Sequence, residues 1–538
     1  MKNKYIIEII LLCFFSLSCN VSEKNVAKKE FIISKATLMD KIKGGWSGQT
    51  IGVVYGAQTE FKYQGAIIPD YQPITWRDGF VKYWWIKKPG LFDDVYNDLT
   101  FVEIFEKYGM NVPADTIAHY FAYADYHLAH ANQAARYNIR QGIMPPASGN
   151  WKNNPHADDL DFQIDADFIG LMNPGMVNKS IATADKVGHI MNSGDGYYGG
   201  VFVAALYSMA FISHDVNEIV NEAVKAIPDS ANFRKVINDV IAFHQKNPTD
   251  WKACWFEIQK KWNRDIGCPK GTFLSFNIDA KMNSAHIALA LLYGNGDFAK
   301  TVEIAVRCGD DTDSNCSNAG GVLGTMLGYS NIPAFWLNPL KEVEALNFEG
   351  TDISLNKGCE LSYKHALAQI ASSGGKTDAD PIVIPIEKII PAPFEQNFPN
   401  MFPVLRDKID LSFSDTLSLS FAGNGFVLYG NLVNQKNVSP AYVDRISKKF
   451  GSESFALGEA DDLYVAELEV YIDNVLDQTV KLPMKNTSRR LEPAWKYLLK
   501  EGNHSIKLKW LNSNPSYAIR INDLIVYSEK SPTSSNPQ

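Results

Sequence analysis

The segment Arg307-Cys-Gly-Asp-Asp-Thr-Asp-Ser-Asn315 carries the strongest fold signal in this chain. It contains Asp310, Asp311 and Asp313, and a helical pattern rich in Ala and Gly follows from Cys316 to Leu327. Small side chains along a helix allow close packing against a neighbouring helix. The segment therefore predicts a tightly packed helix whose preceding loop holds several carboxylates.

A second acidic segment, Leu91-Phe-Asp-Asp-Val-Tyr-Asn-Asp98, also stands directly before a helical pattern. Two carboxylates at positions i and i+2 of a tight loop direct their oxygens into a shared space. The hydroxyl of Thr312 or Ser314 adds a neutral oxygen. Hard cations such as Mg²⁺ are bound by shells of this kind. The two segments together predict a site for a divalent cation.

Helix capping is the alternative interpretation of both segments. Asp, Asn, Ser and Thr at a helix start commonly satisfy free backbone N–H groups. One such residue is enough for a cap, whereas each segment offers three aspartates, and these repel one another unless a cation lies between them. This repulsion favours metal binding over capping.

The sequence pattern of residues 35–371 is that of one large helical domain. Apolar residues recur there at three- and four-residue spacing, and clear strand alternation is absent. The plainest examples are Asp98–Tyr108, Thr183–Ile212, Ala280–Tyr293 and Phe298–Arg307.

A linker at residues 372–381, rich in Ser, Gly and Asp, separates this domain from a β-rich region at 382–530. Short β-branched or aromatic runs alternate there with turn residues, and Ile472–Val475 and Lys500–His504 are predicted hairpin turns. About eight strands predict an all-β sandwich or jelly roll. Residues 531–538 are expected to be a disordered tail. The predicted fold is thus multidomain, an all-α domain followed by an all-β domain.

The N-terminus has the pattern of an export signal. Lys2 and Lys4 precede an apolar run that is too short to span a bilayer, and Ser18-Cys19 is similar to a lipoprotein processing site. We expect residues 1–19 to be a lipoprotein signal and residues 20–34 a tether. The expected location is the periplasm or the outer surface, with the lipid anchor as the contact with a membrane.

The composition and the cysteine pattern limit the partners, metal sites and disulfides that are expected. The net charge of −8 is modest and no long Lys/Arg stripe is present, so nucleic acid is not an expected partner. Five cysteines lie beyond the signal, and no CxxC pair or Cys/His cluster in the sequence suggests zinc. Cys254 and Cys268 either form a disulfide or remain two buried thiols.

The motifs together resemble the ADP-ribosylglycohydrolase family. Gly309–Ser314 is similar to the family's G-G-D-T-D-T motif, and Gly52–Phe61 has the spacing of its G-D-A-L-G-x-x-x-E-F segment. Phe92-Asp93-Asp94, Ser148-Gly-Asn150 and Gly188-His189 follow in the family's order. The resemblance covers about residues 38–345. It implies an all-helical glycohydrolase domain that holds one or two Mg²⁺ ions, with Mn²⁺ as an alternative. The implied metal ligands are Asp93, Asp94, Asp311, Asp313 and Ser314.

This chain departs from the family pattern at several positions. Val53 replaces the family's Asp, Phe92 replaces a Thr that supplies an oxygen, Asp310 replaces the second Gly, and Ser314 replaces Thr while retaining the hydroxyl. The resemblance implies that Glu60 is a ligand or an acid/base group, and we place Glu60 first and Asp98 second as catalytic carboxylates.

Two further loops supply candidate substrate-binding residues. Residues 153–167 are rich in aspartate, and their carboxylates are good acceptors for sugar hydroxyls. Residues 191–200 combine glycines, an acid and two tyrosines. A solvated acidic loop and a turn with inward-packed aromatics are the respective alternatives. With the Ser148-Gly-Asn150 loop, the candidates are Asn150, His156, Asp158, Asp159, Asp165, Asp195, Tyr197 and Tyr198.

These features predict a metal-dependent hydrolase that cleaves an N- or O-glycosidic bond at an anomeric carbon. The resemblance implies ADP-ribosyl substrates, whereas the expected export favours a carbohydrate or nucleoside glycoside as the small-molecule partner. The rival interpretation is a surface lipoprotein that has lost catalysis and binds glycan through Trp495, Trp510 and Tyr517 of the β-domain. A further alternative is that these aromatics are core residues and the domain braces the enzyme.

Overall fold

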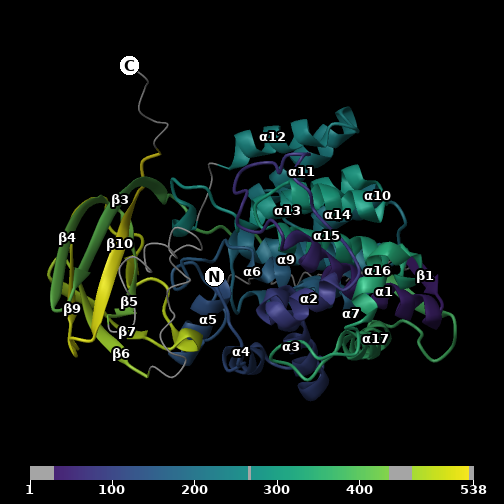
Figure 1. Cartoon of the computed structure of the whole chain (residues 1–538), viewed down its shortest axis with the longest axis horizontal. Helices are drawn as coiled ribbons and strands as arrows, with labels where there is room; N and C mark the ends of the chain where they lie inside the picture. The colour runs from purple at the N-terminus through teal and green to yellow at the C-terminus, as the bar shows by residue number, and fades with distance from the viewer. Residues whose placement is uncertain (1–28, 264–267, 436–462, 532–538) are drawn as a thin grey trace, which may run out of the picture.

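The computed structural model describes residues 29–263, 268–435 and 463–531. The chain forms a large helical domain and, beside it, a smaller β-domain built from its C-terminal part (Figure 1). The predicted signal with Cys19, the first part of the tether and residues 532–538 lie outside the described residues. The all-α domain followed by an all-β domain confirms the predicted fold class.

The helical domain begins at Lys35 and ends at Ser372. Its helices are α1 (Lys35–Gly56), α2 (Phe80–Lys87), α3 (Asp93–Tyr108), α4 (Ala114–Ala122), α5 (His130–Arg140), α6 (Asp161–Ile164), α7 (Asp167–Met172), α8 (Val177–Gly188), α9 (Gly194–Ala210), α10 (Val216–Ala223), α11 (Asn232–Lys246), α12 (Trp251–Trp262), α13 (Ala280–Gly294), α14 (Phe298–Arg307), α15 (Thr312–Leu327), α16 (Ala334–Lys341) and α17 (Leu355–Ser372). Short 3-10 helices include Pro89–Phe92, Val224–Ala226, Pro269–Gly271 and Tyr329–Asn331.

Four helices form the centre of this domain, because α9, α13, α15 and the larger part of α1 are buried. Helices that are apolar or small on every side belong inside a large domain. Amphipathic helices such as α10, α11 and α14 cover this centre with one apolar face each.

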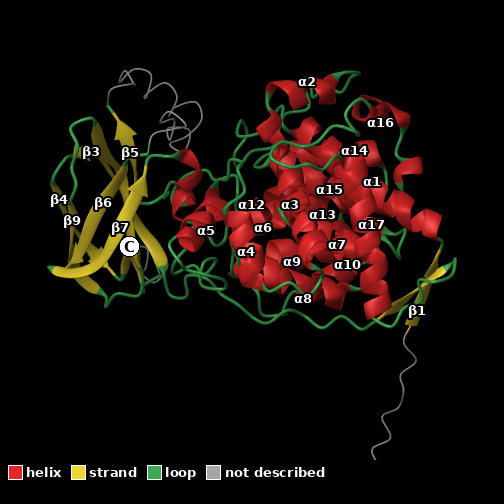
Figure 2. Ribbon diagram, turned by 90° about the horizontal axis from the view of Figure 1, so that it is seen from below, coloured by secondary structure: helices red, strands yellow, loops and turns green. Residues whose placement is uncertain are grey.

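A small two-stranded sheet closes the helical domain at the far end from the β-domain (Figure 2). Strand β1 (Lys29–Ile33) pairs antiparallel with β2 (Ile382–Ile386), with Ile33 opposite Ile382. The last residues of the predicted tether are therefore a strand. The strand expected at residue 382 does form, but it pairs with β1 and is not part of the sandwich. Ile33, Ile382 and Ile384 are buried against the helical core, which explains this pairing.

Residues 387–398 run back across the helical domain towards the β-domain. Ile390 N donates to Asn178 Oδ1 at 2.9 Å, Ala392 N donates to Ala226 O at 2.8 Å, and Tyr198 Oη donates to Pro393 O at 2.9 Å. This extended segment therefore connects the helices that contain Asn178 and Tyr198 to the start of the sandwich.

The β-domain is a sandwich of two four-stranded antiparallel sheets. One sheet has the order β3 (Phe402–Phe413), β10 (Tyr517–Ser528), β5 (Gly425–Asn434) and β8 (Ala494–Lys496). The other has the order β4 (Thr416–Gly423), β9 (Gly502–Trp510), β6 (Val465–Ile472) and β7 (Val475–Pro483). Alternate residues of both sheets, such as Leu428, Val470, Leu508 and Ile521, meet in one apolar core.

The predicted hairpins have different outcomes. Asp473 and Asn474 join β6 to β7 with φ values of 51° and 65°, as a two-residue turn requires. Residues 500–504 do not form a hairpin, because β8 pairs with β5 in one sheet and β9 pairs with β4 and β6 in the other. That segment crosses between the sheets.

An apolar cluster joins the two domains. Trp151 lies 5.1 Å from the ring of Phe398 and 5.4 Å from that of Tyr497. Polar contacts surround the cluster: Arg489 Nη2 donates to Leu128 O at 2.9 Å, and Trp495 Nε1 donates to Lys152 O at 2.9 Å. The sandwich is therefore docked onto the loops of the helical domain.

The aromatics suggested for glycan stacking are already in contact with other side chains. The Trp510 ring is in the sandwich core, Tyr517 stacks on Tyr464 at 4.1 Å, and the guanidinium of Arg490 lies 4.1 Å over Trp495. These placements favour the interpretation in which the sandwich braces the helical domain.

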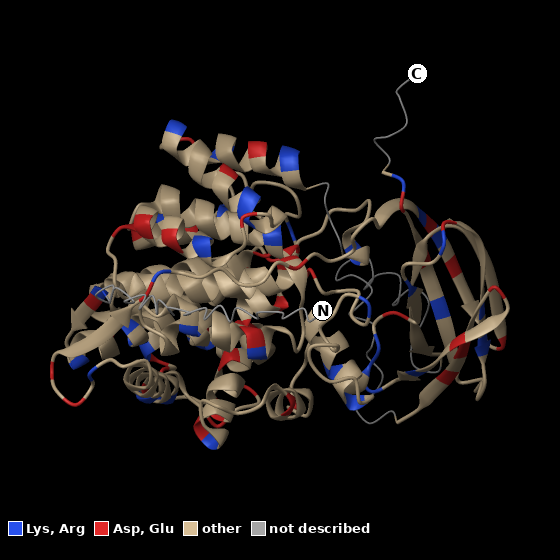
Figure 3. Cartoon of the chain, turned by 180° about the vertical axis from the view of Figure 1, so that it is seen from behind, with Lys and Arg blue, Asp and Glu red and all other residues tan. Residues whose placement is uncertain are grey.

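The described part of the chain contains no helix that is both long and apolar enough to cross a membrane. Basic and acidic residues are interspersed over both domains (Figure 3). Cys254 and Cys268 are separate buried thiols, so the disulfide alternative is wrong in this structure.

Candidate active site

The close contact of α1 with α15 positions the acidic residues. A Cβ on Gly44, Gly48, Gly52 or Gly56 of α1 would lie only 2.1–2.2 Å from the carbonyl oxygens of Gly324, Gly320, Cys316 and Thr312 respectively. The residue numbers run in opposite directions, so the helices are antiparallel. The end of α1 therefore meets the start of α15, which brings Glu60 beside Asp311 and Asp313.

The loop before α15 reverses the chain at Gly309 and Asp310, where φ is 74° and 58°. Asp tolerates this left-handed conformation better than most side chains do. The Asp310 carboxylate accepts hydrogen bonds from Gly65 N at 2.6 Å and from Gln259 Nε2 at 3.4 Å. Asp310 thus stabilises the loop, while Asp311 and Asp313 remain for the site.

Carboxylates from three separate segments meet at the start of α15. One oxygen each of Glu60, Asp311 and Asp313 lies within 4.8 Å of the others. Asp93 and Asp94, in the first turn of α3, are close enough to Asp313 for its charge to raise their pKa values, while the Ser314 side chain lowers the pKa of Asp94. The two acidic segments therefore lie close enough for their charges to interact, while metal binding by these residues stays a prediction.

The mutual repulsion of these groups is visible in their pKa values. Burial, followed by the charge of Asp313, raises the pKa of Asp93 to about 7 and the pKa values of Glu60, Asp94 and Asp311 well above their usual range. Lys88 Nζ, 3.4 Å from Glu60 Oε2, supplies an opposing positive charge. This excess of negative charge requires protons or a cation.

The donor set fits a hard divalent cation. It consists of carboxylate oxygens and one hydroxyl, and the buried Oδ1 of Asp94 has no hydrogen-bond partner among the described residues. Asp311, at the N-cap position of α15, makes no side-chain capping bond. The capping interpretation therefore does not account for Asp311. Thr312 does not join the set, because its hydroxyl donates to Gly56 O at 2.8 Å.

Asp98 lies one helical turn beyond Asp94 and is fully buried. Its Oδ2 accepts from Gln49 Nε2 at 3.0 Å and from Phe168 N at 3.3 Å. Burial and then the charge of Asp167 raise its pKa well above the usual value. Asp98 is thus a buried, hydrogen-bonded residue one turn away from the carboxylate cluster. Its catalytic role stays a prediction.

Sequence reasoning missed several residues of this region. Lys88 pairs with Glu60, Asn283 Oδ1 accepts from Asp311 N at 3.4 Å, and Asp167 is hydrogen-bonded by Tyr207 and Asn318. Asp167 belongs to the aspartate-rich residues 153–167, but it was not singled out there as a site residue. Lys88 and Asn283 carried no local signal, because their contacts depend on packing between distant segments.

The candidate substrate-binding residues do not form one group. Asp158 Oδ1 accepts from Asp195 N at 3.2 Å, and Lys281 Nζ lies 3.7 Å from Asp195 Oδ2. Asp165 is buried between the amides of Asn97 and Asn132, at 3.1 and 2.8 Å.

The remaining candidates are buried or bonded within the protein, although the buried hydroxyl of Tyr197 has no hydrogen-bond partner among the described residues. Tyr197 and Tyr198 are fully buried, which favours the inward-packed alternative for that loop. Asn150 Oδ1 accepts from Lys152 N at 3.1 Å within a turn. His156 and Asp159 share a 2.7 Å contact close to the sandwich. A substrate role for any of these residues stays a prediction.

Comparison with known proteins identifies the family of the helical domain. The model of the ADP-ribosylglycohydrolase family matches residues 34–364. The chain belongs to the ADP-ribosylglycohydrolase family. A stretch of 66 residues is 30% identical to the ADP-ribosylarginine hydrolase Tri1 of Serratia proteamaculans (strain 568), and it covers 12% of this chain and 18% of that protein. The chain therefore matches less than a fifth of that relative's length. A solved structure described as an ADP-ribosylglycohydrolase-related protein complex aligns with a TM-score of 0.43 and 14% identity, over 62% of this chain and 99% of the other.

As a member of the ADP-ribosylglycohydrolase family, the chain departs from the pattern in ways that the structure explains. Phe92 packs against Trp85 at 4.9 Å, so an apolar contact replaces a Thr oxygen. Val53 is fully buried in α1. Asp310 occupies the left-handed position of the second Gly, as described above.

Proposed function

We propose that the helical domain is a divalent-metal-dependent hydrolase of a glycosidic bond. The observation that carries the proposal is the convergence of carboxylates from α3, α15 and the loop after α1, with one lysine against them. Asp93, Asp94, Asp311, Asp313 and Ser314 would hold one or two Mg²⁺ ions, or Mn²⁺. A bound cation would orient and polarise sugar oxygens near the bond that breaks.

The protein's own acid/base group in this proposal is Glu60. Burial and Asp313 raise the pKa of Glu60, which favours its protonated form, while Lys88 opposes this effect. A glutamic acid in this state can donate a proton to a leaving group, and the resulting carboxylate can then accept one from water. Asp98 is the second candidate for this role.

We infer that the substrate is an extracytoplasmic carbohydrate or nucleoside-type glycoside. The support is the export pattern at residues 1–19, which places the expected enzyme outside the cytoplasm. Family membership keeps ADP-ribosyl compounds among the candidates. An N-terminal lipid anchor would hold the protein at a membrane.

The test is a release assay on the purified full-length protein. It would be offered glycans, nucleosides and ADP-ribosyl conjugates, each with and without chelator. We expect release of a free sugar or base that a chelator abolishes and Mg²⁺ or Mn²⁺ restores. Asp311→Asn combined with Asp313→Asn should abolish release and metal binding together. Release that persists in both the chelated protein and this double variant would refute the proposal.

A further inference from the structure

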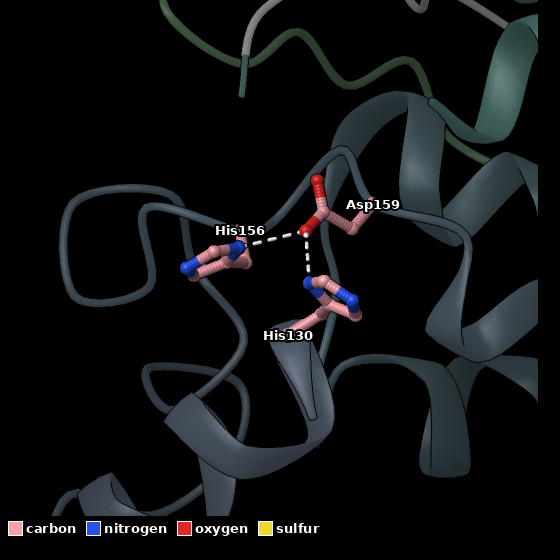
Figure 4. Close-up of side chains that lie close together, drawn as sticks. All are labelled: His130, His156 and Asp159. Carbon is pink, nitrogen blue, oxygen red and sulfur yellow. Dashed lines mark hydrogen bonds and ion pairs between the residues drawn. The ribbon is translucent and has the colours of Figure 1, made fainter. Parts of the chain in front are cut away.

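A second group of potential metal ligands lies between the helical domain and the sandwich. It consists of His130, the first residue of α5, and His156 and Asp159 from the loop before α6 (Figure 4). Asp159 Oδ2 is 2.7 Å from His156 Nδ1 and 3.7 Å from His130 Nδ1. The ligand atoms of all three residues lie within 4.8 Å of one another.

The chemistry of this group differs from that of the active-site carboxylates. Two imidazoles and one carboxylate suit Zn²⁺, whereas Mg²⁺ prefers oxygen ligands. A sulfur atom is also near, because Cys268 Sγ lies 3.8 Å from His156 Nδ1. Asp159 is fully buried, and its Oδ1 has no hydrogen-bond partner within the described part of the chain.

The sandwich supplies the residue that orients this group. Glu492 Oε1 lies 2.7 Å from His156 Nε2, and both side chains are buried. A metal-bound histidine commonly donates its other ring N–H to a carboxylate, which fixes the ring and strengthens the ligand. The pair His156 and Glu492 has this arrangement, with Nδ1 directed at Asp159 and Nε2 at Glu492.

We propose that His130, His156 and Asp159 bind one Zn²⁺-like cation at the domain interface, with Glu492 as the residue that positions His156. The site joins α5 and the loop before α6 to the sandwich. The alternative is a protonated His156 held between Asp159 and Glu492 with no metal. That ion pair needs only His156, whereas the cation site also needs His130.

Zinc binding by the full-length protein decides between the cation site and the metal-free ion pair. The Asp311→Asn/Asp313→Asn protein serves as the background, so that the active-site carboxylates do not contribute. After chelation and return of Zn²⁺ with a large excess of Mg²⁺, we expect one tightly bound zinc per chain. His130→Ala changes the least buried ligand and should abolish binding of this zinc ion. Asp159→Asn should do the same.

Two further variants separate a cation site from a structural defect. Glu492→Gln should weaken zinc binding by about 10- to 100-fold while retaining the stoichiometry. His189→Asn is the matched control, because His189 also lies between two carboxylates, Asp185 and Glu395, and it should leave zinc binding unchanged. No zinc in the background protein, or zinc retained by His130→Ala, would overturn the proposal and favour the ion pair.

Discussion

At the scale of single residues, Glu60 is the side chain whose role most needs a direct test. Glu60→Gln keeps the shape and removes the transferable proton. If Glu60 is the acid/base group, the turnover rate should fall by about 100-fold or more, because positioned acid/base groups contribute at least that much. Steady-state kinetics on the substrate found by the release assay would measure this.

Metal binding by the same variant separates two roles for Glu60. An acid/base group can be changed while the bound Mg²⁺ or Mn²⁺ stays, whereas loss of a ligand weakens the metal. We expect calorimetric titration to give an unchanged metal affinity, with the exposed Glu342→Gln as the control. A parallel loss of metal and activity would make Glu60 a ligand.

Asp165 provides a prediction about pH. Burial raises its pKa to about 8, against a usual value near 4, and Asn132 and Asn97 only partly oppose this effect. The folded protein thus holds a proton that the unfolded chain releases above about pH 4. This contribution to stability is complete below that pH, declines by up to about 1.4 kcal/mol per pH unit, and is lost above about pH 8.

Asp165→Asn should therefore remove part of the loss of stability between pH 5 and 8, raising the melting temperature most at the alkaline end. The new amide can be accommodated if Asn97 or Asn132 turns over, because each has an Oδ1 without a partner in the described structure. The exposed Asp78→Asn is the control. Equal shifts of both variants at all pH values would contradict the prediction.

The sequence predicted those residues of the site that belong to motifs. The acidic segments stand out because their aspartates directly precede helical patterns, and the family resemblance implies Asp93, Asp94, Asp311, Asp313 and Ser314 as the ligand set, which stays a prediction. Lys88 and His130 were not found, since their partners lie far away along the chain. The sequence shows no Cys/His cluster for the same reason, because His130 and Cys268 come from segments that approach His156 and Asp159 only in the folded protein.

At the scale of elements, the glycine stripe of α1 should be the least tolerant feature of the fold. In Gly52→Ala the new Cβ would lie 2.2 Å from Cys316 O, which belongs to a rigid helix backbone. The helices would have to separate, and we expect a loss of stability of about 2 kcal/mol or more. Chemical denaturation measures this loss.

Gly502→Ala is the matched control, because the nearest atom to its Cβ is 3.9 Å away and its φ is not positive. It should change stability little. Gly52→Ala should also weaken metal binding, since the contact of α1 with α15 places Glu60 beside Asp311. Retention of both stability and metal affinity would show that the two helices can adjust freely.

Long periodic helices were predicted well, and pairing between distant segments was not. Periodicity reports which face of an element is buried, so Ala280–Gly294 and Phe298–Arg307 were located nearly to their ends. The periodicity does not show which other segment of the chain that face packs against or pairs with. Residues 382–386 read as a strand of the sandwich, yet buried Ile382 and Ile384 pair with β1 on the helical domain.

At the scale of the whole molecule, the sandwich and the helical domain depend on each other. The segment 387–398 crosses the helices, and Arg406 of β3 donates to the carbonyls of Lys270 and Thr272 at 2.9 and 3.1 Å. Asn397 of the crossing segment also donates through Nδ2 to Asp158 Oδ1 at 2.6 Å. The sandwich thus contacts and supports one side of the helical domain, which accounts for a β-domain in the proposed hydrolase without requiring glycan binding by it.

Removing the centre of the interface should uncouple the two domains. Trp151 is 5% exposed, and Trp151→Ala would leave a cavity between Phe398 and Tyr497 that costs about 3–5 kcal/mol. We expect one calorimetric unfolding transition in the unmodified protein and two in this variant, with the helical domain melting earlier. Phe256→Ala, at an exposed position of α12, should keep the single transition. A single unshifted transition in Trp151→Ala would mean that the polar contacts alone join the domains, because the apolar cluster would then contribute no measurable stability.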